Sequence, residues 1–176
     1  LIVIIAGGSL LSVFLLSILQ EKSFSSYFAM GSYSFFASFL FSLLSGPTGE
    51  ELGWRGYLRE ELDKKYSFFG AALIQGIIWT FWHTVLWFVD SDFTGFELVP
   101  YIVSNLLVMT SLVFVMNTVL EKHKNLIYSI VIHFTFNFIY CFLQVDIWFY
   151  ALFSVVYVLI GAGFYLWRTK SVQERE

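Results

Sequence analysis

The sequence predicts an all-α integral membrane protein, a polytopic bundle of about six transmembrane helices. Of its 176 residues, 58% are hydrophobic and 13% are charged, whereas a soluble domain usually carries about 25% charged residues. Apolar runs recur along the chain at the length of about 20 residues that a helix needs to cross a bilayer. Because lipid offers the backbone no hydrogen-bond partners, these runs are expected to be helices.

The apolar runs form one transmembrane domain over residues 1–176, with the polar residues of interest between about 42 and 145. Gly46-Pro47 interrupts the second run, so we expect this helix to be kinked or to restart there. Thr48 and Glu51 have the spacing of a capping box, and the restarted helix should continue to Lys64-Lys65. The predicted apolar spans cover 1–20, 24–45, 67–89, 98–120, 126–145 and 147–167.

Charge and cysteine content narrow the classes of function. The net charge is −3 and the cations lie near predicted helix ends, so the sequence does not suggest nucleic-acid binding. Cys141 is the single cysteine, which excludes an intrachain disulfide and a metal cluster built on cysteines. The chain begins with Leu1 rather than Met, so we expect that it can lack N-terminal helices of a longer protein.

Basic residues near helix ends predict the orientation in the membrane, because cytoplasmic loops carry an excess of Lys and Arg. If the spans alternate in direction, Lys22 is the only one of these basic residues on one side of the membrane, and the others lie on the opposite side. The C-terminus is therefore expected to face the cytoplasm. The other side holds Lys64, Lys65, Lys122, Lys124, Arg168, Lys170 and Arg175.

Three groups of polar residues stand inside the apolar runs. They are Glu50-Glu51 with Arg55, then His83, then His133 with Asn137. Ionisable groups are expensive in a bilayer and usually mark function. Counted from the cytoplasmic helix ends, Glu50, His83, His133 and Asn137 lie roughly 14–24 Å into a core about 30 Å thick. They can form one site if the Glu50 helix is embedded. If Gly46-Pro47 were a cytoplasmic turn, Glu50 would miss His83.

The spacing of these residues assigns different tasks to the two carboxylates. Glu51 and Arg55 are i,i+4 neighbours on a helix, so each lowers the cost of burying the other. Glu50 has Trp54 one turn on and no cation, so it is the carboxylate left free to take a proton. His133 and Asn137 are also i,i+4 and point the same way. Purely structural alternatives are a capping Glu pair, an interfacial His83 and interhelical hydrogen bonds from His133 and Asn137.

Two kinds of hydrolytic chemistry fit this set of side chains. Glu50, His83 and His133 can supply the three protein ligands of a catalytic Zn²⁺ site. Without a metal, Glu50 and His83 can hold and deprotonate a water while His133 and Asn137 donate to the developing oxyanion. Spacing alone does not separate the two. The sequence has neither a Gly-x-Ser-x-Gly elbow nor a His-Glu-x-x-His helix.

These motifs resemble those of the CPBP family of intramembrane proteases. This CAAX-protease and bacteriocin-processing (Abi) group includes the type II CAAX prenyl endopeptidases. Its pattern is Glu-Glu-x-x-x-Arg, an aromatic residue with x-x-x-His, and His-x-x-x-Asn, matched here by 50–55, 79–83 and 133–137. Trp79 stands where the family usually has Phe. The resemblance implies peptide-bond hydrolysis with Glu50, His83, His133 and Asn137 as catalytic residues and Glu51 and Arg55 in support.

The resemblance leaves the metal and the substrate open. The family is commonly called a metalloprotease, but its motif does not settle whether Zn²⁺ is bound. Expected partners are the lipid bilayer and a peptide or membrane-associated protein substrate, of CAAX or bacteriocin type, without nucleic acid. The oligomeric state is not indicated. The alternative is a non-catalytic protein for binding, transport or bacteriocin immunity that uses the same polar cluster.

Overall fold

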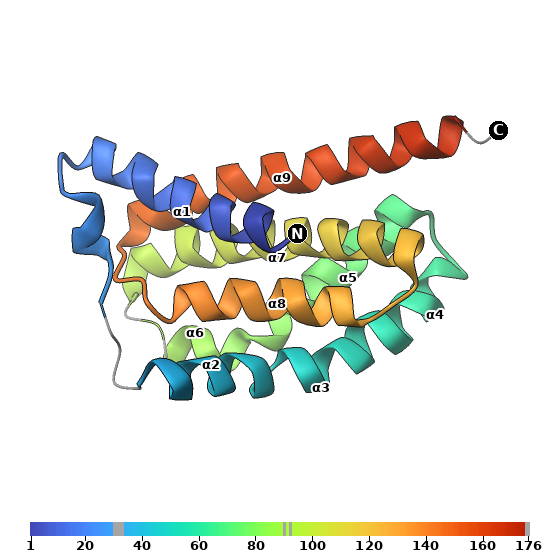
Figure 1. Ribbon diagram of the computed structural model, residues 1–176, viewed down its shortest axis with the longest axis horizontal. Coiled ribbons are helices and arrows are strands. Elements are labelled where there is room, and N and C mark those ends of the chain that lie inside the picture. Colours follow the sequence, from blue (N-terminus) through green and yellow to red (C-terminus); the bar gives the residue numbers. More distant parts are fainter. Residues whose placement is uncertain (30–33, 90, 92, 175–176) are drawn as a thin grey trace.

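The computed structural model describes residues 1–29, 34–89, 91 and 93–174, which form a bundle of helices (Figure 1). The described residues contain one isolated β-bridge, Phe28 with Leu143, and no longer strand. The predicted all-α membrane fold is confirmed. Among these residues, three helices are long and apolar enough to cross a membrane, and the other predicted spans are shorter or interrupted. The three are α1 (Ile2–Leu19), α7 (Leu98–His123, preceded by η3, Gly95–Glu97) and α9 (Ile147–Gln173).

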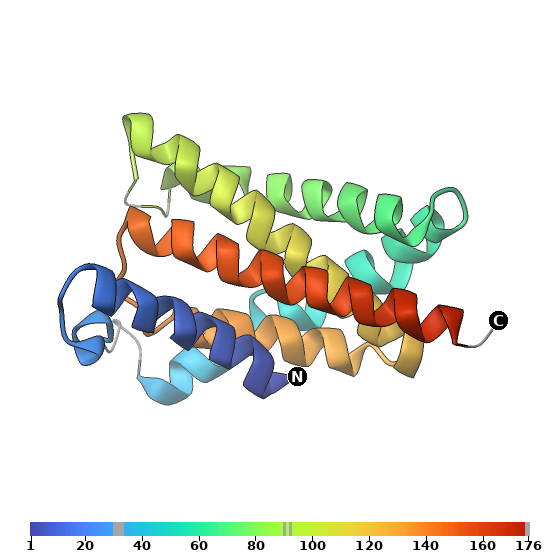
Figure 2. The ribbon, with the colours of Figure 1, turned by 90° about the horizontal axis from the view of Figure 1, so that it is seen from above.

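The long helices provide the frame on which the other elements pack. Figure 2 shows α1, α7 and α9 along the length of the bundle, and α9 packs on both of its long neighbours. Helix α7 also packs against α5 (Phe68–Trp82) and α8 (Ile127–Tyr140). A β-carbon on Gly76 of α5 would lie 2.7 Å from the Thr110 Cα of α7, so only glycine allows this approach. The buried core includes Val108, Leu112, Met116, Phe149, Phe153 and Tyr157.

The predicted interruption at Gly46-Pro47 is confirmed. Pro47 occupies the first turn of a new helix, where its missing N–H costs little, and Gly46 is the N-cap. The predicted capping box is wrong, because Glu51 bonds to Arg55 and His133 instead of returning to the helix start. The chain then continues along one side of the bundle (Figure 1). Its elements are α2 (Phe35–Leu44), α3 (Pro47–Glu51), the π-helix η2 (Leu52–Leu58) and α4 (Arg59–Asp63).

The second apolar run begins its helix later than predicted. Residues Phe24–Tyr27 form the short 3₁₀ helix η1, and α2 starts only at Phe35. Serine side chains here bond to local groups, as the Ser26 hydroxyl does to the Ser23 carbonyl at 2.7 Å. Such bonds compete with a helix. Phe28 also pairs with Leu143, and residues 30–33 lie outside the described part of the chain.

The third span is not one continuous helix. Helix α5 ends at Trp82, and α6 (Thr84–Val89) begins after His83. At this break, side chains form hydrogen bonds with backbone carbonyls of α5. His83 Nδ1 bonds to the Trp79 carbonyl, and the Thr84 hydroxyl donates to the Phe81 carbonyl. Local bonds of this kind end a helix. Asp90 and Asp92, from the following acidic connector, lie outside the described residues.

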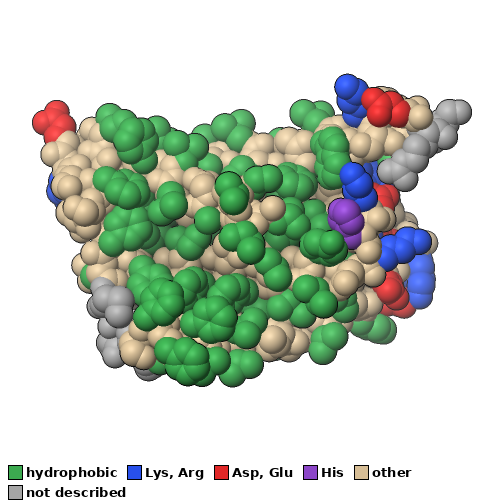
Figure 3. Space-filling view, in the orientation of Figure 1, with side chains coloured by type: hydrophobic (Ala, Val, Ile, Leu, Met, Phe, Trp, Pro, Cys, Tyr) green, Lys and Arg blue, Asp and Glu red, His purple; other side chains and the backbone are tan. Residues whose placement is uncertain are grey.

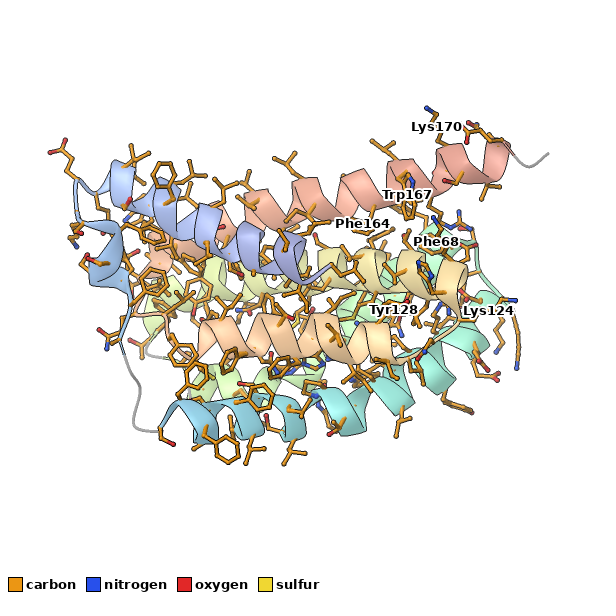
Figure 4. All side chains as sticks on the ribbon, in the orientation of Figure 1. Phe68, Lys124, Tyr128, Phe164, Trp167 and Lys170 are labelled. Atoms are coloured by element: carbon orange, nitrogen blue, oxygen red, sulfur yellow. The ribbon has the colours of Figure 1, made fainter. Side chains whose placement is uncertain are left out.

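Charged side chains gather at the ends of the bundle, and hydrophobic ones cover the flank between them (Figure 3). Lys and Arg concentrate at the end where the C-terminus lies, whereas Lys22 belongs to the opposite end near η1. Figure 4 labels Lys124, Trp167 and Lys170 at the basic end. Arg175, also counted for this side, lies outside the described residues. The segregation follows the predicted pattern, and the cytoplasmic placement of this end stays a prediction.

Candidate active site

The Glu50 carboxylate is held by two indole groups from different elements. Its Oε2 accepts hydrogen bonds from Trp79 Nε1 of α5, at 3.0 Å, and from Trp54 Nε1 of η2, at 3.2 Å. Glu50 is half-buried and stands in the short helix α3 directly after the Gly46-Pro47 interruption. The two bonds fix one oxygen and leave Oε1 toward the space beside Gly46.

Glu51 forms a buried charge cluster with partners from two elements. Its Oε1 accepts from Arg55 Nη1 at 3.0 Å and from His133 Nδ1 at 2.8 Å, and all three side chains are almost wholly buried. The Arg55 guanidinium also lies over the Trp79 ring, 4.1 Å from its centroid. The predicted Glu51–Arg55 pair is confirmed. The bond from His133 to Glu51 was not foreseen, because it depends on how α8 packs against α3.

His83 occupies the break between α5 and α6. Its Nδ1 lies 2.9 Å from the Trp79 carbonyl oxygen. A carbonyl only accepts, so Nδ1 carries the proton, and in the neutral ring Nε2 is the nitrogen with a free lone pair. The ring is half-buried and lines the large cavity described below. The break in the helix therefore presents a hydrogen-bond acceptor to that cavity.

His133 and Asn137 lie one turn apart on α8 and face the same cavity. Gly46 approaches the His133 ring closely: a β-carbon on it would lie 3.3 Å from His133 Nε2 and 3.6 Å from Glu50 Oε1. These two atoms therefore border the same small volume. Within the described structure the Asn137 side chain makes no hydrogen bond, so its amide group is available to a ligand.

A cavity of about 1310 Å³ brings these groups together. Glu50, His83, His133 and Asn137 all line it, although they come from three separate stretches of sequence. The arrangement in which Glu50 misses His83 is not found, since both groups bond to Trp79. The cavity extends toward the η1 end of the bundle, away from the basic end. Its lining there includes Gln20, Lys22, Tyr27, Gln144 and Asp146.

The side chains fit a metal site poorly in this arrangement. Across the described residues, no three His, Cys, Asp or Glu side chains are grouped as ligands of one ion. In the part of the chain that the structure describes, the atoms without protein partners are Glu50 Oε1 and the Nε2 atoms of His83 and His133, and these three groups are not gathered around one point.

Several residues of the site were not foreseen from the sequence. Trp54 and Trp79 are hydrogen-bond donors, whereas the motif marked Trp79 only as an aromatic. Gln75 of α5 donates to the Trp54 carbonyl in η2, and Asn117 of α7 donates to the Gln75 amide oxygen at 2.9 Å. Gln75 and Asn117 are polar residues inside apolar runs, and this pattern could have predicted a hydrogen bond between their helices.

The fold and site define a class of protein: a polytopic helical membrane protein whose carboxylate, histidines and amide line one cavity. The Rce1-like type II CAAX prenyl endopeptidase family matches residues 31–139, which include all of these groups. The chain is also 36% identical, over 141 residues, to the CAAX prenyl protease 2 of Methanococcus maripaludis. That similarity covers 73% of this chain and 49% of the relative, so the chain spans about half the relative's length. The chain belongs to the Rce1-like type II CAAX prenyl endopeptidase family.

Proposed function

We propose that the protein is an intramembrane endopeptidase that hydrolyses a peptide bond in a membrane-associated protein or peptide. One observation carries the proposal: the Glu50 carboxylate and the His83 ring are both anchored on Trp79 and both present a free atom to one cavity. A water there has two acceptors, Glu50 Oε1 and His83 Nε2. This is the arrangement that general-base catalysis requires.

The first step is attack of that water on the substrate carbonyl. Glu50 takes a proton from the water as its oxygen forms a bond to the carbonyl carbon. His83 Nε2 accepts the second hydrogen bond and orients the nucleophile. Collapse of the tetrahedral intermediate then breaks the C–N bond, and the proton on Glu50 passes to the leaving amine.

The developing oxyanion needs hydrogen-bond donors in the same cavity. The Asn137 amide group has its donors available there. His133 donates through Nε2 only when its ring carries both protons, because Nδ1–H is already bonded to Glu51. The Glu51 carboxylate stabilises such an imidazolium, so Glu51 assists catalysis through His133. Donors of this kind act on the transition state.

The substrate class follows from the relatives. The family description and the relative's name both specify a CAAX prenyl protease, so we propose a lipidated, CAAX-type peptide or protein as substrate. Processing of bacteriocin-type peptides is a second candidate with no comparable support. The non-catalytic alternative is not favoured, because the matching family and the similar relative are both described as CAAX prenyl proteases.

The test uses purified protein in detergent with quenched fluorescent peptides, lipidated and plain. Wild type should cleave a lipidated peptide, and Glu50→Gln should lose more than about a hundredfold in kcat with its fold intact. Glu60→Gln, which changes an exposed carboxylate ten positions on, is the matched control and should keep full activity. Equal cleavage by wild type and Glu50→Gln would refute the proposal. A parallel series with a chelator tests the metalloprotease form, which predicts loss of cleavage and its return with Zn²⁺.

A further inference from the structure

Trp79 lies at the centre of the site without facing the solvent. It is 0% exposed and contacts four of the site's polar residues. The indole N–H donates to Glu50, the ring carries the Arg55 guanidinium, and the backbone carbonyl accepts from His83. The ring also meets that of His133, with 5.1 Å between centroids. Trp79 therefore links the proposed base, its partner histidine and the buried charge cluster.

Three of these contacts depend on the ring or the backbone, and one depends on the indole nitrogen. Any aromatic residue keeps the carbonyl for His83 and, in large part, a ring face for Arg55. Tryptophan supplies an N–H at this place, whereas phenylalanine has no polar side-chain atom. The residue type that the motif usually carries here, Phe, would leave Glu50 Oε2 with the Trp54 donor alone.

The N–H bond restricts the orientation of the Glu50 carboxylate. A glutamate side chain has three rotatable bonds, and holding it in one geometry costs conformational entropy. Two donors from different elements, α5 and η2, converge on the same oxygen. With Oε2 held, Oε1 stays toward Gly46 and the His133 ring and can accept from the reacting water. Precise placement of a catalytic group is worth orders of magnitude in rate.

We propose that the Trp79 indole N–H is a positioning donor that fixes Glu50 for catalysis, a role that the ring alone cannot fill. The proposal rests on the proposed protease function. It treats Trp79 as acting through Glu50, without contact to the substrate. Because a correctly placed base matters in the transition state more than in substrate binding, its loss should lower kcat and leave KM unchanged.

The kinetic test compares Trp79→Phe with wild type on the peptide that wild type cleaves best. The variant keeps an aromatic ring and should lose about tenfold to a hundredfold in kcat, the value of a hydrogen bond to a charged group. Trp148→Phe, an exposed tryptophan on α9, is the control for tryptophan loss and should keep full activity. An unchanged kcat in Trp79→Phe overturns the proposal, while loss of cleavage in Glu50→Gln still upholds the protease.

A tryptophan isostere separates the N–H from the shape of the ring. Trp79 can be replaced by the non-natural tryptophan analogue in which a sulfur atom takes the place of the indole N–H. This replacement preserves the bicyclic ring and removes the hydrogen-bond donor. This variant should show the same loss of kcat as Trp79→Phe. If the isostere is fully active while Trp79→Phe is impaired, packing explains the loss and the positioning role is wrong.

A spectroscopic test needs no substrate. The indole N–H resonances of the six tryptophans can be assigned in ¹⁵N-labelled protein by single Trp→Phe variants. Glu50→Ala removes the shared acceptor and should shift the Trp54 and Trp79 resonances upfield, with Trp148 and Trp167 unmoved. A Trp79 resonance that stays in place overturns the inference, even if no peptide is ever cleaved.

Discussion

Glu51 has more than one partner, and this decides what its substitution would do. Its Oε1 accepts from both Arg55 and His133, so one carboxylate balances a guanidinium and orients a histidine. The group is 0% exposed. A buried ion pair adds little net stability over an apolar pair, but removing one partner leaves the other charge uncompensated. Arg55 would be that charge here.

Glu51→Gln is therefore expected to destabilise the protein by about 3 kcal/mol or more, because it removes the charge of the carboxylate that is hydrogen-bonded to the buried Arg55 guanidinium. Unfolding followed by circular dichroism in detergent measures this. Glu61→Gln breaks an exposed pair with Lys64 at the wet end of α4 and should leave the unfolding midpoint unchanged. Similar shifts in the two variants would show that the buried cluster is not what stabilises the site.

Gly46 is expected to matter for activity more than for folding. Gly46→Ala puts a β-carbon 3.3 Å from His133 Nε2, so the His133 ring must move by a few tenths of an ångström, and 3.6 Å from Glu50 Oε1, where it takes up space beside that oxygen. Misplacement on this scale should lower kcat about tenfold or more. Gly49→Ala is the matched control, since a β-carbon there meets nothing within 4 Å. Full activity in Gly46→Ala would contradict the geometry.

At the scale of the element, the π-helix η2 determines where Trp54 points. The Trp54 carbonyl accepts from the Arg59 N–H, five residues on, and also from the Gln75 side chain. Asn117 in turn donates to Gln75, so α7 and α5 together support η2. Single π-turns are rare in proteins, and those that occur are often found at functional sites. This one directs the Trp54 indole to Glu50.

A double-mutant cycle on Gln75 and Asn117 tests this support. Gln75→Leu leaves the buried Asn117 amide without its acceptor and should cost about 1–3 kcal/mol. Asn117→Leu should cost a similar amount, and the double variant clearly less than their sum, because both changes break one bond. Chemical denaturation in detergent gives the three values. Strict additivity would mean that the two side chains do not interact.

The sequence predicted those features of the elements that depend on local pattern. Apolar length located the helices, and Gly46-Pro47 located the restart, because a proline without an N–H suits a first turn. The depth of each polar residue predicted that Glu50 and His83 would share one site if the Glu50 helix was embedded, and both line the same cavity. What could not be predicted depends on partners from other elements. The Glu51 side chain bonds to His133 of α8 instead of the start of its own helix. The helix break at His83 is accompanied by side-chain bonds to the carbonyls of Trp79 and Phe81.

At the scale of the whole molecule, the cavity and the basic charges lie toward opposite ends. The cavity reaches from the four site residues to the η1 end, where Lys22 and Asp146 line it. The Lys and Arg cluster lies at the end with the C-terminus (Figure 3). Since basic ends of membrane proteins face the cytoplasm, the structure favours a cavity that opens away from that side.

This orientation is expected to appear in a cysteine-accessibility experiment. Cys141 is the single native cysteine, so Cys141→Ser gives a background without thiols. Ser23→Cys marks the η1 end, and Lys170→Cys marks the basic end, where the native lysine side chain is 78% exposed. A membrane-impermeant maleimide should label Ser23→Cys in intact cells and Lys170→Cys only after permeabilisation. The reverse pattern would place the cavity mouth on the cytoplasmic side. The charge distribution would then have to be explained by contacts at the basic end, such as Arg168 with Glu121, instead of by topology.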